Sequence, residues 1–89
     1  MSKISKINDF LEIPREVSGK FPKITITGFD EMMIENFKGI IEYEDFFARI
    51  NTHIGIININ GFNLKLNQMT EDDILVSGRI ESVDFEAKK

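Results

Sequence analysis

Apolar and polar residues alternate along most of the chain, and the longest alternating run occupies residues 54–66. A period of two is typical of a β-strand with one buried face. Asn60-Gly61 stands in the middle of this run, and Asn-Gly between two alternating segments favours a two-residue type I′ hairpin. The pattern therefore predicts a hairpin that pairs Ile59 with Phe62.

A second alternating run, residues 46–51, precedes this hairpin, with Thr52-His53 as the expected connection. If that connection is a tight loop, Ile50 lies opposite Gly55. A longer loop that uses Gly55 is the alternative, because Thr-His is poor type I′ chemistry. The two turns together predict one apolar inner face, made of Phe46, Ala48, Ile50, Ile57, Ile59, Phe62, Leu64 and Leu66.

Shorter segments complete the predicted sheet, with strands expected at residues 23–27, 31–35, 40–43 and 74–85. Met32 and Ile34 face inward in the second of these, and residues 36–39 are expected to form a type I turn. The alternation changes phase within residues 78–82, which implies a bulge, a bend or two separate strands. The residues expected at turns are Gly28, Gly39, Asn60, Gly61 and Gly78.

The N-terminal segment differs from this β pattern. Ile4, Ile7 and Leu11 recur at helical spacing, and Pro14 ends the pattern, so residues 1–13 are expected to form a short amphipathic helix. Such a helix is too short to be stable in isolation, so it should dock on the sheet or on a neighbouring chain.

We therefore expect an all-β fold, mainly an antiparallel meander of about seven or eight short strands, with a short N-terminal helix. Residues 1–20 would be the helix and linker, and residues 21–86 the β domain. The pattern does not distinguish a sandwich from a roll or a barrel.

The composition of the chain excludes several classes of function. The 89 residues include no cysteine, which excludes disulfides and thiolate metal sites, and the net charge of −4 does not suit a nucleic-acid partner. No apolar run approaches the roughly 20 residues of a membrane span. We accordingly expect a cytoplasmic protein with neither nucleic-acid binding nor a membrane span.

Candidate chemistry is sparse. His53 is the only histidine and has no cysteine or serine neighbour that would suggest nucleophilic catalysis. The acidic groups at residues 42–45 and 71–73 lack the ligand spacing of a calcium loop, so solvated turns are the simpler interpretation. We expect no catalytic residue, cofactor or metal site, and hence no enzyme; a small ligand- or cation-binding module that uses the acidic loops is the alternative.

One face of the predicted meander is mixed. Phe47, Ile54 and Ile56 point to the side opposite the inner face, among polar residues. A fully solvated face should be more polar, so part of it is expected to be covered. The candidate interaction surface comprises Phe47, Ile54 and Ile56, together with Ile4, Ile7 and Leu11 of the N-terminal segment.

Four blocks of sequence carry a family resemblance: FPKITITG at 21–28, IENFKGI at 34–40, GIINING at 55–61 with Leu64 after it, and ILVSGRIESVDF at 74–85. In sequence and spacing these blocks resemble the YabP/YqfC family of sporulation proteins, and the YqfC branch in particular. The resemblance covers roughly three quarters of the chain.

The resemblance implies a small protein of endospore-forming bacteria that acts in the mother-cell compartment during sporulation. It also implies a membrane-anchored sporulation protein as a partner. Together with the mixed face of the meander, the resemblance suggests a non-enzymatic assembly or scaffold component. This component would form a homo-oligomer or dock on that partner through β surfaces.

Overall fold

The computed structural model describes residues 21–87, which form six antiparallel β-strands and no helix. Two of these strands are long, so the expected seven or eight short strands are corrected to six. The segment expected to form an N-terminal helix, with Ile4, Ile7 and Leu11, lies outside the described residues. The strands are β1 (Lys23–Thr27), β2 (Glu31–Glu35), β3 (Phe37–Glu44), β4 (Phe47–Thr52), β5 (Gly55–Gln68) and β6 (Asp73–Ala87).

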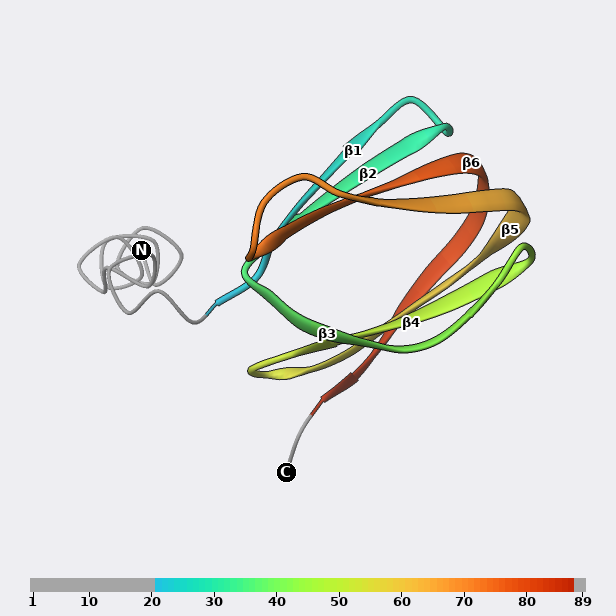
Figure 1. The fold of residues 1–89 in the computed structure, drawn as a ribbon. Helices are drawn as coiled ribbons and strands as arrows, with labels where there is room; N and C mark the ends of the chain where they lie inside the picture. Colours follow the sequence, from blue (N-terminus) through green and yellow to red (C-terminus); the bar gives the residue numbers. More distant parts are fainter. Residues whose placement is uncertain (1–20, 88–89) are drawn as a thin grey trace, which may run out of the picture.

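One sheet contains all six strands, in the order β1-β2-β6-β5-β4-β3. The long strands β5 and β6 bend together, so the sheet folds over on itself into two layers (Figure 1). In one layer the first half of β6 pairs with β2, and in the other the first half of β5 pairs with β4. Within the described residues β1 pairs only with β2 and β3 only with β4, so the architecture is an open roll.

The core lies between the two layers and consists of alternate residues from the inner strands. Ile50 pairs with Ile57 and Ala48 with Ile59, which places all four side chains on the inner face. The predicted inward positions of β2 are confirmed. The buried apolar residues are Met32, Ile34, Ala48, Ile50, Ile57, Ile59, Leu64, Ile74 and Val76.

Two members of the predicted inner face are exposed instead, Phe46 and Phe62. Phe46 lies in the turn before β4 rather than in the strand. Phe62 lies between two irregularities in the β5 and β6 pairing, where the alternation of faces is broken.

The predicted hairpin at Asn60-Gly61 is wrong, because β5 continues through these residues as one strand. Gly61 lies at a bend where β5 and β6 come very close: a Cβ at this position would stand 1.9 Å from the carbonyl oxygen of Arg79. The glycine is therefore required for close backbone approach, and the positive φ of this region belongs to Asn63 at 53°.

The loop between β4 and β5 is the longer alternative that includes Gly55. The Thr52 hydroxyl accepts hydrogen bonds from the backbone N–H groups of Ile54 at 3.2 Å and Gly55 at 3.1 Å. It also donates one to the carbonyl of Gly55 at 2.6 Å, which explains why this buried threonine has no unsatisfied group. Ile50 therefore pairs with Ile57, and the pairing of Ile50 with Gly55 is wrong.

The predicted type I turn at residues 36–39 is also wrong. β3 begins at Phe37, and Asn36, at a φ of 65°, forms the connection from β2. Gly39 lies inside β3, at an irregularity in its pairing with β4. Asparagine tolerates this left-handed conformation better than most residues, so one residue is enough to redirect the chain.

Gly28 lies in the turn between β1 and β2. Gly78 lies inside β6 at the bend, where the change of phase was expected. β6 is one continuous strand that bends, and its pairing with β5 is irregular between Ile80 and Ser82. The expected bend and pairing irregularity are therefore both present, and the alternative of two separate strands is wrong.

Substitution of Gly61 by alanine should destabilise the fold by at least about 2 kcal/mol, because the new methyl group meets β6 backbone rather than a movable side chain. Gly39→Ala is the matched control, since nothing lies within 4 Å of its added Cβ, and should change stability by less than about 0.5 kcal/mol. Urea unfolding followed by circular dichroism measures both. Equal stability of the two variants would contradict this account of the bend.

Candidate interaction surfaces

The outer face of the β3-β4-β5-β6 layer carries a polar network centred on Arg49. Its guanidinium donates to Glu42 on β3 at 3.0 Å, to Asn58 on β5 at 3.0 Å and to Glu86 on β6 at 3.0 Å. The Asn58 amide also donates to Glu86, at 2.8 Å. One arginine thus links all four strands of this layer across its surface.

These contacts shift the ionisation of both charged ends. Hydrogen bonds to Glu42 and Glu86 raise the pKa of Arg49 further above its usual range. The amide of Asn58, followed by Arg49, lowers the pKa of Glu86 below its ordinary value of 4.5. The groups are solvent-accessible, so their contribution to stability is small, and the network mainly keeps this face polar.

The structure separates the apolar residues predicted for this face. Phe47 is in register with Asn60 and Ile56 with Asn51, while the row formed by Arg49 and Asn58 lies between them. The side chains of Phe47 and Ile56 are half-buried. Ile54 lies in the loop before β5, so the three do not form one continuous patch.

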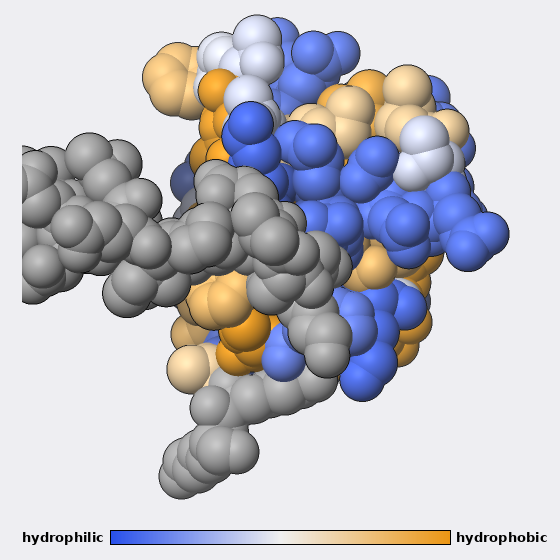
Figure 2. Space-filling model, turned by 90° about the vertical axis from the view of Figure 1, so that its left-hand side faces the viewer, coloured by the Kyte–Doolittle hydropathy of each residue, from blue (hydrophilic) through white to orange (hydrophobic). Residues whose placement is uncertain are grey.

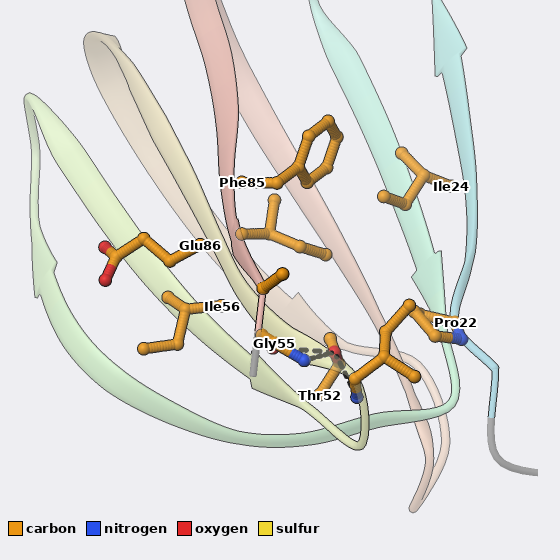
Figure 3. A pocket seen from close by; sticks show the side chains of 10 residues that line it. Pro22, Ile24, Thr52, Gly55, Ile56, Phe85 and Glu86 are labelled. Carbon is orange, nitrogen blue, oxygen red and sulfur yellow. Dashed lines mark hydrogen bonds between the residues drawn. The ribbon is translucent and has the colours of Figure 1, made fainter. Parts of the chain in front are cut away.

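Ile54 and Ile56, but not Phe47, line an apolar groove at the end of the roll where β1 begins. The groove has a volume of about 200 Å³. Figure 3 shows Pro22 and Ile24 on the β1 side and Phe85 across from them, with Glu86 on the other side of β6. The lining residues are Pro22, Ile24, Thr52, Ile54, Gly55, Ile56, Ile57, Phe85, Glu86 and Ala87.

Alternation alone did not reveal this groove, because it depends on how the two layers meet. The sequence did contain one indication of it, because Val83 and Phe85 share the same phase of the apolar alternation. In the structure Val83 lies opposite Ile59 and Phe85 opposite Ile57, on the inner face. Figure 2 views this end of the roll and shows hydrophobic surface, in orange, beside a broad hydrophilic region.

The two outer edges of the roll differ in character. β3 has two irregularities in its pairing with β4 and carries Glu42 and Glu44, features that discourage addition of another strand. The hydroxyl of Tyr43 also donates to the Leu64 carbonyl and ties β3 to β5. β1 pairs with β2 without any irregularity, and its inward-facing Ile26 is 51% exposed.

Comparison with known proteins shows the family to which the chain is related. The sequence model of the YabP family matches residues 19–89. The chain is also 31% identical over 75 residues to "Uncharacterized protein YqfC" of Bacillus subtilis (strain 168), covering 84% of this chain and 81% of the relative. No solved structure matches significantly.

The chain belongs to the YabP family. This membership indicates a sporulation-associated protein. The matched region contains every strand of the roll, so the fold described above is that of the family region of this chain.

The acidic segments of this YabP family member do not converge. Across residues 21–87, no three acidic or histidine side chains gather closely enough to hold a metal ion. The Asp73 carboxylate instead accepts hydrogen bonds from the Thr70 hydroxyl at 3.0 Å and from the backbone N–H of Asn36 at 3.3 Å. His53 is exposed in the loop between β4 and β5. In the same region no helix is long and apolar enough to cross a membrane.

Glu86→Gln should give a protein whose thermal stability depends less on acid than that of the wild type. A lowered folded-state pKa stabilises the fold above the ordinary pKa of 4.5, and this contribution disappears as pH falls through the folded value. The wild type should therefore melt slightly higher than the variant at pH 7, and the difference should shrink as pH falls below 4.5. Melting followed by circular dichroism from pH 3 to pH 7 tests this.

Glu71→Gln, which lies in the connection between β5 and β6 outside the network, controls for the loss of one negative charge. An identical pH profile for wild type and Glu86→Gln would contradict a stabilising role for this carboxylate.

Proposed function

We propose that this YabP family member is a non-enzymatic assembly protein of the sporulating cell. It self-associates, or docks on a membrane-anchored sporulation protein, through its β surfaces. The observation that carries the proposal is the difference between the two edges of the roll, because the edge of β1 is regular and leaves Ile26 half exposed.

A strand added at β1 would provide backbone hydrogen bonds and apolar contacts along this edge. Its backbone would pair with the N–H and C=O groups of β1 that face away from β2, and its side chains would cover Ile24 and Ile26. The irregularities and acidic residues of β3 make the opposite edge a poor template. The docking edge is therefore β1.

A second copy of the chain fits this edge. Two β1 strands paired antiparallel about Thr25 would place Ile24 opposite Ile26 and Lys23 opposite Thr27. Apolar residues then face apolar residues, and no two like charges stand directly opposite each other. Such a pairing joins two rolls through one continuous sheet.

Ile26→Lys should convert the assembled protein to a monomer without unfolding it, because an inward-pointing charge at an edge blocks strand addition. Ile41→Lys is the matched control: Ile41 lies on the β3 edge with 44% of its surface exposed, and its replacement should leave the assembly unchanged. Size exclusion with light scattering gives the mass, and circular dichroism gives the fold.

Loss of assembly in Ile41→Lys, with assembly retained in Ile26→Lys, would place the contact on the β3 edge and contradict the proposal. A monomeric wild type at all concentrations would contradict self-association.

A further inference from the structure

The groove at the start of β1 is a gap in the apolar interior. Phe85 is on the inner face, paired with the buried Ile57, yet 65% of its surface is exposed. Ile54, which also lines the groove, is 45% exposed. The inner-face pairing of Phe85 is typical of a core side chain, and its exposure leaves apolar surface that a further apolar side chain could cover.

We propose that the N-terminal segment of the same chain, residues 4–11, binds in this groove and completes the core. An engineered apolar cavity of about 150 Å³ holds one benzene molecule. The groove, at about 200 Å³, is therefore large enough for one or two apolar side chains but not for a whole helix. Ile7 and Leu11, four residues apart, form a pair of the right size on one side of a helical segment.

The chain reaches the groove at its rim. Pro22 is one of the lining residues, so residues 1–20 join the described structure directly beside the opening. Leu11 lies ten positions before Phe21, and an extended chain of ten residue steps spans up to about 35 Å. Ser18-Gly19 lies within this stretch and provides residues suited to a reversal of direction.

Charge and tethering both favour this occupant over a free molecule. Residues 1–20 contain four basic and three acidic side chains, for a net charge of +1, while the remaining residues carry seven basic and twelve acidic ones, for −5. Opposite charges attract the segment to the body. A short tether holds the segment at a local concentration of about a millimolar or more, so a modest intrinsic affinity suffices.

Pairwise cross-linking of the full chain tests the proposal, and the natural absence of cysteine makes every introduced thiol unique. Asn8→Cys is combined with Ala87→Cys, which lies on the groove wall. The control combines Asn8→Cys with Phe29→Cys, in the turn at the far end of β1 from Pro22. The tether is long enough for residue 8 to reach either position. Ala87 lines the same groove as Pro22, so it is nearer the start of the tether, and proximity alone favours the groove pair to some extent. The part of the groove-pair rate that depends on the apolar side chains of Ile7 and Leu11 therefore measures docking.

With a short bismaleimide at low micromolar protein, the groove pair should form an intramolecular cross-link at least tenfold faster than the control pair. Adding Ile7→Asp and Leu11→Asp should remove this preference. Adding Ser2→Asp and Ser5→Asp, which introduce the same charge outside the apolar stripe, should preserve it. Circular dichroism of each variant shows that the roll is folded.

Equal rates for the two pairs would overturn the proposal, since the segment would then have no preferred site. Cross-linked dimers from the groove pair, without the intramolecular product, would also overturn it and assign the groove to a second copy. The test is independent of assembly through the β1 edge, because Ile26→Lys can be included in every variant to keep the chain monomeric.

Discussion

The close approach of β5 and β6 at their shared bend is the constraint on which the roll depends. A Cβ on Gly61 would meet the carbonyl oxygen of Arg79, and one on Gly78 would meet that of Asn63 at 2.4 Å. Only strands without side chains at these points can bend so tightly, and the bend lets one sheet supply both layers of the core. Without it, Ile59 and Val76 would lie on one flat face with nothing opposite them.

The same bend creates the two exposed sheet edges and the apolar groove. A sheet that folds over without closing leaves two edges, and the sequence treats them differently: β3 is irregular and acidic, while β1 is regular and short. The groove beside Phe85 lies where the start of β1 meets residues 52–57 and the last residues of β6. The exposed edge of β1 and the groove are therefore neighbouring consequences of one incomplete closure.

Local alternation predicted most of the strands and most of the core, because burial on one face leaves a period of two that a single segment can show. It correctly placed residues 31–35 as a strand with Met32 and Ile34 inward. It failed at Asn60-Gly61, where the local turn preference was real but the glycine was required by Arg79, eighteen positions away. The groove was missed for a similar reason, since its walls come from segments far apart in the sequence.

The position of β6 in the sheet bears on how the chain folds during synthesis. β6 is the last of the six strands to leave the ribosome, yet it stands in the middle of the sheet between β2 and β5. The β1-β2 hairpin and the β3-β4-β5 meander have no shared core until β6 joins them. Folding of the roll must therefore wait until its last strand has emerged, so the nascent chain exposes apolar β hairpins that are open to premature association.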